Sequence, residues 1–190
     1  MRLFVAVLPP AATVDELARE VGRLRRLPGA DGLRWTERAG WHFTLAFLGD
    51  VPEEVLPELR ERLTRAARRT EPFQLALHGG GRFGDRALWA GAEGELDVMR
   101  RLAERAEAAA RRAGLPMDDH RRYTPHLTLA RSRAAAVDLR PYVEELDGFT
   151  SRPWTVGDVA LVQSRLPRSG VPGERPRYEE VERRPLGAAG

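Results

Sequence analysis

The sequence predicts an α+β fold: two pseudo-symmetric lobes with antiparallel sheets flanked by helices around a central cleft. Strand-period and helix-period segments follow one another without regular β-α alternation, hairpins are indicated, and one short residue pattern occurs twice. The length of 190 residues suits one domain made of two small lobes. We therefore expect residues 1–190 to form a single domain of two intertwined lobes, with 186–190 as a flexible tail.

The first half of the chain is expected to run strand, helix, strand, helix. Thr13 and Glu16 have the spacing of a capping box at the start of a helix, and Pro28-Gly29 ends that helix. Apolar residues recur at helical spacing between positions 55 and 66. The expected strands are 2–8, 33–36 and 42–48, and the expected helices are 13–27 and 55–66.

The second half repeats this mixture of strands and helices. Gly79-Gly80-Gly81 lies in a turn-rich segment between two strands, and it lacks the Lys-Ser/Thr ending of a nucleotide-binding P-loop. It is therefore interpreted as a flexible turn. The expected strands are 73–78, 86–91, 126–131, 154–162 and 177–183, the helices 96–110 and 138–146, and the loops 79–85 and 163–176.

The charged residues are unusual because all 31 basic residues are arginine. Arginine suits phosphate and RNA, but a lysine-free chain rich in alanine, glycine and proline is also typical of a GC-rich genome. A net charge of +3 is weak support for a nucleic-acid partner. Composition alone therefore does not assign a function, and we favour the genomic explanation.

Several classes of protein are excluded by what the sequence lacks. There is no cysteine, which excludes disulfides, zinc-thiolate sites and thiol nucleophiles. No apolar run is long enough to span a bilayer, and the apolar start is too short for a signal peptide. We expect a cytoplasmic protein with no membrane partner, and a monomer by default.

Two segments share the pattern His-x-Thr-x, namely His42-Phe43-Thr44-Leu45 and His126-Leu127-Thr128-Leu129. In a strand, residues two apart share a face, so each segment directs an imidazole and a hydroxyl to one side. Four histidines and nine threonines would give roughly 0.2 such patterns by chance. The pair therefore indicates chemistry rather than packing.

Paired histidines suit the hydrolysis of a cyclic phosphodiester. One group must take a proton from water and another must give a proton to the departing oxygen, and an imidazole with a pKa near 6.5 serves either purpose. Threonine hydroxyls on the same face can donate hydrogen bonds to the phosphate oxygens as negative charge develops. Such a mechanism needs no metal or other cofactor.

The motifs and their surroundings resemble the 2H phosphoesterase superfamily, and most closely its bacterial RNA 2′,3′-cyclic phosphodiesterases, also described as 2′-5′ RNA ligases. The resemblance extends to about Leu186. It implies two lobes around a cleft, hydrolysis of RNA 2′,3′-cyclic phosphate ends to 2′-phosphates, and reversible 2′-5′ ligation. The segments that carry it, beside the two motifs, are Arg2-Leu3-Phe4-Val5-Ala6-Val7, Phe47-Leu48-Gly49, Leu88-Trp89-Ala90-Gly91 and Pro125 to Arg131.

The resemblance also implies roles for individual residues. His42 would be the proton donor to the 3′ oxygen and His126 the proton acceptor that activates water, while Thr44 and Thr128 would bind the phosphate. Arg131 matches a phosphate-binding arginine of the family. Strict strand alternation places its side chain opposite His126, so its role requires a strand end or a bulge that redirects it.

Other residues have weaker signals. Trp41, Phe4 and Phe47 are candidates for stacking on a nucleobase, although core packing is the favoured interpretation for Phe47. The remaining histidines, His78 and His120, are interpreted as surface residues. Neither motif has an evident third ligand nearby, so we expect no metal site.

Two alternatives stay open besides a metal enzyme. A protein with this site could bind RNA termini without turning them over, or it could act on another cyclic phosphate or a 2′-5′ linked nucleotide. The expected partners in every case are RNA ends or small cyclic nucleotides. The sequence does not choose among these substrates.

Overall fold

The structure is a computed structural model that describes residues 1–118, 122–133, 137–166 and 176–188. Its elements occur in the mixed order that the sequence predicted. In chain order they are β1 (Arg2–Val7), α1 (Ala11–Leu24), η1 (Ala30–Gly32), β2 (Leu33–Trp35), η2 (Arg38–Gly40), β3 (Phe43–Asp50), η3 (Glu53–Val55), α2 (Leu56–Arg68), β4 (Phe73–Phe83), β5 (Ala87–Gly94), α3 (Leu96–Arg112), β6 (Leu127–Ser132), α4 (Arg140–Asp147), β7 (Trp154–Val156), β8 (Asp158–Arg165) and β9 (Arg177–Pro185).

The strands form two antiparallel sheets. The first has the order β3-β1-β8-β9 and the second the order β2-β6-β5-β4-β7. Each sheet draws on both halves of the chain, since β2 pairs with β6 in the second sheet while β8 and β9 return to the first. The predicted α+β class with antiparallel sheets is confirmed.

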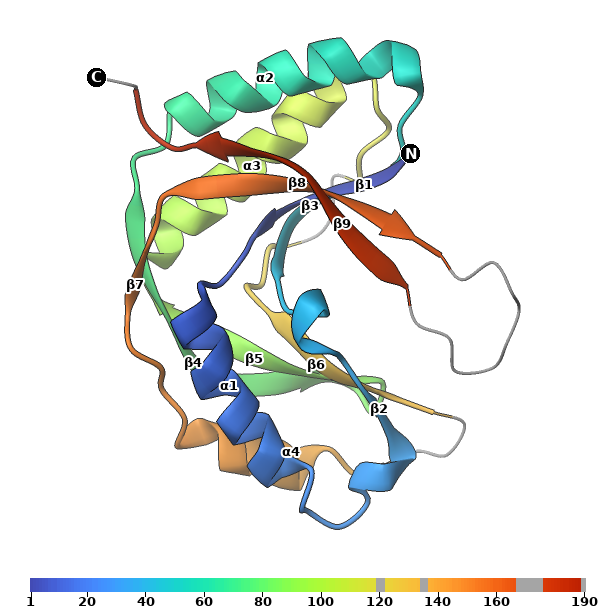
Figure 1. Cartoon of the computed structure of the whole chain (residues 1–190), viewed down its shortest axis with the longest axis vertical. Coiled ribbons are helices and arrows are strands. Elements are labelled where there is room, and N and C mark those ends of the chain that lie inside the picture. The colour runs from blue at the N-terminus through green and yellow to red at the C-terminus, as the bar shows by residue number, and fades with distance from the viewer. Residues whose placement is uncertain (119–121, 134–136, 167–175, 189–190) are drawn as a thin grey trace.

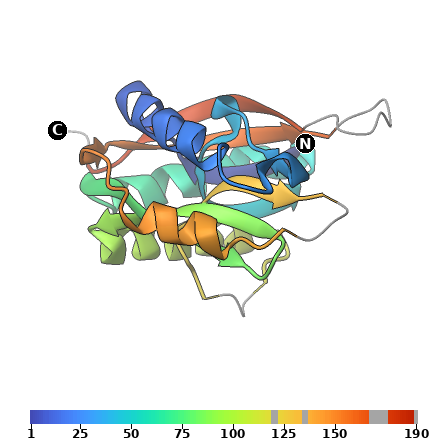
Figure 2. The same cartoon turned by 90° about the horizontal axis from the view of Figure 1, so that it is seen from below.

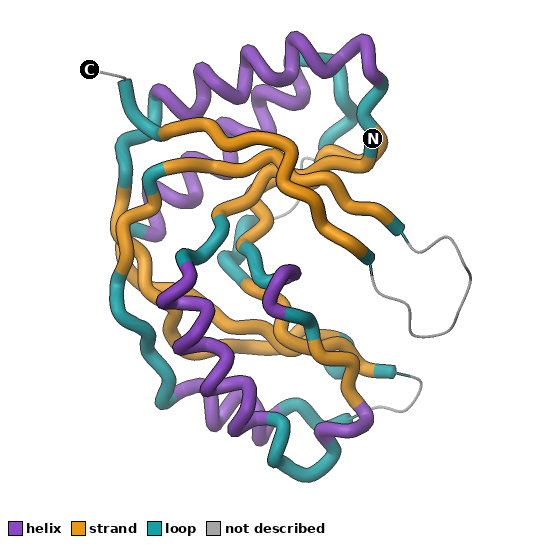
Figure 3. Tube along the Cα trace, viewed as in Figure 1, coloured by secondary structure: helices purple, strands orange, loops and turns teal. Residues whose placement is uncertain are grey.

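Helices cover the sheets from outside (Figures 1 and 2). The pair α2 and α3 lies across the first sheet, with α3 against β3 and α2 against β9. On the second sheet α4 packs against β4 and β5, and α1 contacts α4. Figure 3 shows the strands of both sheets in orange and the helices in purple, in the same view as Figure 1.

Apolar side chains of both sheets join in one large core. On β1, Leu3, Val5 and Val7 belong to it, while Phe4 and Ala6 point to the opposite face and form a smaller cluster with residues of β8. This alternation follows from the pleat of the strand, in which successive side chains face opposite sides. The second face of β1 is the one that meets His42.

Two local predictions in the first half are wrong in detail. The helix α1 begins at Ala11 after Pro10, and no side-chain cap bond forms, so Thr13 and Glu16 lie inside the helix. The proline accounts for this, because its fixed φ allows the helix to start directly after it. Glu16 instead accepts a hydrogen bond of 3.0 Å from the backbone N–H of Arg152.

The glycine-rich segment is also different from its prediction. Gly79, Gly80 and Gly81 lie within β4, which continues to Phe83, rather than in a flexible turn. The strand shifts register between Leu77 and Gly80, and Gly79 has a positive φ of 59°. Glycine supplies that conformation without steric cost, so the segment is a bulged strand.

The C-terminal part contains three further corrections. The strand predicted at 154–162 is two strands in different sheets, separated by Gly157. The first residues of the predicted loop 163–176 belong to strand β8, which ends at Arg165. Residues 167–175 of that loop lie outside the described residues. The start of the expected flexible tail is anchored, because Leu186 is only 7% exposed and the backbone N–H of Gly187 donates a hydrogen bond to the carbonyl oxygen of Ala67. The last two residues, 189–190, lie outside the described residues.

Within the described part of the chain, no helix is both long and apolar enough to cross a membrane.

Candidate active site

The two repeated segments occupy corresponding places in the two sheets. His42 directly precedes β3 and His126 directly precedes β6, so each imidazole stands at the start of its strand rather than inside it. Thr44 and Thr128 are half-buried. The alternate residues are fully or almost fully buried, as predicted: Phe43, Leu45, Leu127 and Leu129.

In β3 the pairing with β1 skips two residues, Leu45 and Leu48, and the first of them belongs to the motif. Thr44 lies opposite Ala6 and Ala46 lies opposite Val5, which leaves Leu45 without a partner in the register. Both Leu45 and Ala46 are buried. An extra residue of this kind resets the alternation of side chains along the strand.

In β6 the same irregularity occurs at the same motif position. Thr128 lies opposite Trp89 and Ala130 lies opposite Leu88, so Leu129 has no partner on β5. Both Leu129 and Ala130 are buried, as their counterparts are in β3. The two motif strands therefore share an irregularity as well as a residue pattern.

The bulges determine which side chains share a face with the threonines. After Leu45 the next exposed residue is Phe47, and after Leu129 it is Arg131. Each therefore returns to the face of its own His-x-Thr pair. The strand geometry thus removes the objection that alternation raised against Arg131.

His42 is held between aromatic rings. Its imidazole stacks on Phe4 with centroids 4.6 Å apart, and Tyr178 meets it edge-on at 5.3 Å. Burial lowers the pKa of His42 to about 4; a hydrogen bond to the backbone of Gly40 opposes this shift, and the nearby His126 lowers the pKa further. In the free protein, His42 is therefore neutral at pH 7.

His126 is fixed by a backbone bond and two aromatic neighbours. Its Nδ1 lies 2.8 Å from the carbonyl oxygen of Thr124. A carbonyl can only accept, so Nδ1 carries the proton and Nε2 of the neutral ring is left as an acceptor. Phe83 meets the ring edge-on at 4.9 Å and Trp89 lies 6.0 Å away.

The position of Trp89 depends on a glycine across the hairpin. Gly81 lies opposite Trp89 in the register of β4 and β5. A Cβ at Gly81 would come within 2.6 Å of the indole Cη2, which is closer than real side chains approach. Gly81 therefore leaves room for the indole that supports the ring of His126.

The two imidazoles come from different sheets and share one electrostatic environment, because a charge on His126 affects the pKa of His42. Each is bonded to the backbone of the residue two positions before it, Gly40 in one case and Thr124 in the other. Such anchors leave the second ring nitrogen available for a reacting group. Two imidazoles, each with one ring nitrogen free, are chemically able to accept and donate protons.

Two of the three aromatic residues proposed for base stacking are not accessible. Trp41 is 5% exposed and belongs to the core, and Phe4 is 1% exposed beneath His42. Both predictions are wrong because packing covers their ring faces. Phe47, for which core packing was favoured, is instead 57% exposed and lies 5.7 Å from Phe4.

The sequence interpretation missed three rings beside the histidines. Phe83 and Tyr178 are 43% and 37% exposed, and Trp89 is half-buried. Phe83 follows the glycine segment that was interpreted as a turn, while Tyr178 lies on the last strand, far from both motifs in the sequence. For Trp89 a signal existed, namely the glycines on the facing strand. The surface position predicted for His78 is confirmed, and His120 lies outside the described residues.

The described residues include no group of three or more His, Cys, Asp or Glu side chains placed to hold a metal ion. A cavity of about 400 Å³ lies away from the histidines, along α3. Its lining mixes arginines with Glu104 and Glu107, so its charges compensate one another. This cavity is therefore separate from the two motif strands.

The family model of the 2′-5′ RNA ligase superfamily matches residues 13–167. This chain belongs to that superfamily. Its members are also called 2H phosphoesterases, and the resemblance found in the sequence is thereby confirmed. The matched range includes both His-x-Thr-x segments and ends before β9, which carries Tyr178.

Curated relatives within the superfamily support the same relationship. The RNA 2′,3′-cyclic phosphodiesterase of Archaeoglobus fulgidus is 33% identical over 176 residues, covering 90% of this chain and 94% of that protein. The one from Thermus thermophilus is 33% identical, with 90% and 85% covered. The one from Geobacillus stearothermophilus is 30% identical over 80% of this chain, which spans only 47% of that longer protein.

Two solved structures have the same fold as this chain over nearly its whole length. TT0787 of Thermus thermophilus has a TM-score of 0.76 at 32% identity, with 100% of both chains covered. E. coli LigT complexed with 3′-AMP has a TM-score of 0.74 at 26% identity, with 97% of both chains covered. The architecture of two antiparallel sheets is therefore that of these neighbours.

Proposed function

We propose that this chain hydrolyses RNA 2′,3′-cyclic phosphate ends to 2′-phosphomonoesters, with His42 and His126 as acid and base. The observation that carries the proposal is the placement of the two imidazoles: they come from different sheets, are within electrostatic reach and are each anchored by a backbone bond. The relatives at 25–33% identity are named RNA 2′,3′-cyclic phosphodiesterases, which supports the same enzyme activity here.

His126 is suited to the role of proton acceptor. Its Nδ1 donates to Thr124 O, so the lone pair of Nε2 is available for a proton of the attacking water. As the water oxygen bonds to phosphorus, its proton passes to Nε2. Phe83 and Trp89 limit the tilt of the ring during this step.

His42 would donate a proton to the 3′ oxygen as the bond from phosphorus to that oxygen breaks. The free protein holds this ring neutral because burial lowers its pKa to about 4. A bound phosphate adds a negative charge beside the imidazole and raises its pKa, since an opposite charge favours the protonated form. Protonation of His42 then accompanies substrate binding.

Thr44, Thr128 and Arg131 would bind the non-bridging oxygens of the phosphate. The two hydroxyls share a face with their histidines, and Arg131 returns to the same face after the bulge. Hydrogen bonds directed at oxygens that gain negative charge in the transition state stabilise it more than the ground state. Neither step requires a metal, so hydrolysis is expected to survive chelation.

The same site would ligate RNA halves. A 2′-5′ linkage forms when the 5′ hydroxyl of a second RNA replaces water as the nucleophile at a 2′,3′-cyclic phosphate and the 3′ oxygen departs, with the same proton roles as in hydrolysis. The proton roles exchange when the 2′-5′ linkage is cleaved back to the cyclic phosphate. The substrates are RNA ends or small cyclic nucleotides, and we propose that the protein acts as a monomer.

The product of a short RNA with a 2′,3′-cyclic end tests this function. We expect a terminal 2′-phosphate, identified by its phosphorus NMR signal against 2′- and 3′-phosphate standards. A 3′-phosphate would contradict the assigned leaving group. Tight binding of the RNA with no turnover would instead identify a protein that holds RNA termini.

A further inference from the structure

Two arginines face each other on neighbouring strands beside the active site. Arg34 on β2 lies directly opposite Arg131 on β6, and both side chains are exposed. Their neighbours Leu33, Trp35 and Ala130 are buried on the other face of the sheet. Like charges directly opposite in an antiparallel pair are destabilising, so this pair weakens the fold unless an anion lies between the guanidinium groups.

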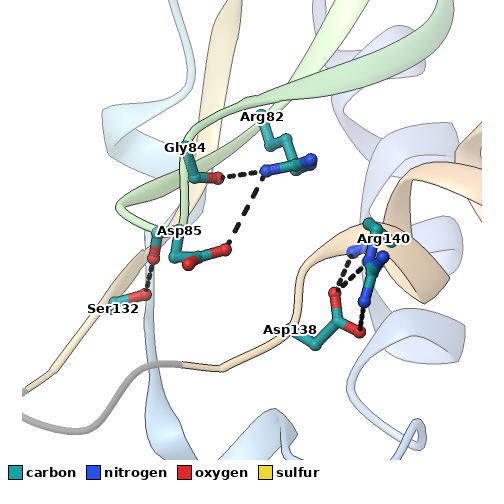
Figure 4. Close-up of polar contacts among 6 residues, drawn as sticks. All are labelled: Arg82, Gly84, Asp85, Ser132, Asp138 and Arg140. Carbon is teal, nitrogen blue, oxygen red and sulfur yellow. Dashed lines mark hydrogen bonds and ion pairs between the residues drawn. The ribbon is translucent and has the colours of Figure 1, made fainter.

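Two nearby arginines, Arg82 and Arg140, are paired with carboxylates of the protein, as Figure 4 shows. Arg140 forms bonds of 2.9 and 3.0 Å with the carboxylate of Asp138, and Arg82 lies 3.9 Å from Asp85. For Arg34 and Arg131, the described ranges contain no carboxylate in an ion pair with either side chain. The two guanidinium groups are therefore available to a ligand.

The register places both arginines on the face of the catalytic residues. Arg131 lies opposite Ala87 of β5, which lies opposite Phe83 of β4, so these residues form one row across the sheet with Arg34 at its end. Cross-strand partners share a face. Since Phe83 contacts the ring of His126, the row leads from the reacting group to the arginine pair.

The contacts of the cyclic phosphate are already assigned to other residues. In the proposed function, Thr44, Thr128 and Arg131 already bind that group. Arg34 lies one strand further out, about 4.8 Å away at the backbone. Arg34 is therefore placed to contact a second anion, and the neighbouring phosphate of an RNA chain supplies one.

We propose that Arg34 binds the backbone phosphate next to the reacting cyclic phosphate and so selects polynucleotide ends over nucleoside cyclic phosphates. Exposed Phe83, in the same row, offers its ring to an adjoining base. Arg34 acts through binding and not through the proton transfers. The inference rests on the proposed function, because that function places the cyclic phosphate between the histidines.

The test compares Arg34→Gln with Arg26→Gln, which removes the same charge from an exposed position in the turn after α1. Three substrates are used: a nucleoside 2′,3′-cyclic phosphate, the same compound with a 5′-phosphate, and a trinucleotide with a 2′,3′-cyclic end. For Arg34→Gln we expect KM to rise about tenfold with the trinucleotide and less than twofold with the nucleoside compound, at unchanged kcat. The control should match the wild type throughout.

The salt dependence gives an independent readout. Each phosphate contact contributes about 0.7 to the slope of log affinity against log salt for single strands, so Arg34→Gln should lower that slope by about this amount with the trinucleotide. An equal rise in KM for all three substrates would overturn the proposal, as would an unchanged KM for the trinucleotide. The 5′-phosphorylated nucleoside should show a rise similar to that of the trinucleotide, because its 5′-phosphate takes the place of the neighbouring backbone phosphate. A rise of less than twofold with that compound would place the contact of Arg34 elsewhere and overturn the proposal.

A binding measurement tests this inference independently of the proposed hydrolytic function. A fluorescent 2′-O-methyl trinucleotide with a 3′-phosphate cannot be cyclised or hydrolysed, and its anisotropy reports affinity alone. We expect Arg34→Gln to weaken its binding about tenfold even if no RNA is hydrolysed. Equal affinity of this variant and the wild type would refute the role of Arg34 whatever the catalytic result.

Discussion

The ring of His42 lies on the ring of Phe4, with a centroid distance of 4.6 Å and an angle of 30° between the planes. Phe4 is thereby removed from solvent and from any base, and His42 loses contact with water on one side. The neutral imidazole is favoured in such surroundings, which is the main reason for its low pKa.

Replacing Phe4 by leucine should therefore raise the pKa of His42 from about 4 toward its ordinary value, because water gains access to the ring. The measurement is a titration of the His42 ring protons by NMR. Phe73→Leu is the matched control, since Phe73 is also buried but lies on β4 in contact with β7. Identical midpoints for His42 in Phe4→Leu and the wild type would show that the stack does not set its protonation.

His42 should also make the stability of the fold sensitive to acid. The pKa of His42 is lower in the folded protein than in the unfolded chain, so its contribution to stability is present above about pH 6.5 and is lost as the pH falls toward 4. A shift of this size corresponds to about 3 kcal/mol. Urea unfolding at pH 8 and pH 4.5 should show a smaller loss of stability for His42→Gln than for the wild type, and equal losses would contradict this linkage.

Gly81→Ala should shift the imidazole of His126 indirectly, by displacing the indole of Trp89 that lies beside it. The added methyl group collides with the indole of Trp89, so we expect a loss of about 1 to 3 kcal/mol in unfolding free energy and a lower kcat. Gly22→Ala is the control, because no atom lies within 4 Å of a Cβ there and alanine favours a helix by about 0.5 to 1 kcal/mol. Wild-type stability and rate in Gly81→Ala would mean that Trp89 does not position the histidine.

The roles of donor and acceptor can be separated by the leaving group. A bis(p-nitrophenyl) phosphate releases a phenolate that departs without a proton, so a variant lacking the acid should retain relative activity with it. We expect His42→Ala to lose much less rate with this compound than with the cyclic RNA end, while His126→Ala loses rate with both. The opposite pattern in steady-state kinetics would exchange the two assignments.

Much of the architecture followed from residue periodicity. The spacing of Leu17, Val21 and Leu24 gave the buried stripe of α1, and the alternation around His42 and His126 gave the buried and open faces of the motif strands. These patterns are local and survive folding because each is set by one buried face.

Features that depend on pairing could not be inferred in this way. The bulges at Leu45 and Leu129 arise from the register with β1 and β5, and they decide where Phe47 and Arg131 point. Tyr178 reaches His42 because β9 pairs with β8 in the same sheet. The burial of Trp41 depends on contacts with distant elements, so an aromatic residue beside a motif histidine was wrongly interpreted as a binding surface.

The most direct test of the central claim is the rate of hydrolysis of a 2′,3′-cyclic RNA end by the wild type, His42→Ala, His126→Ala and the double variant. If both imidazoles act on one phosphorus, each single variant loses at least about a hundredfold in kcat, and the double variant is little worse than the poorer single one. Either single variant working at the wild-type rate would contradict the account.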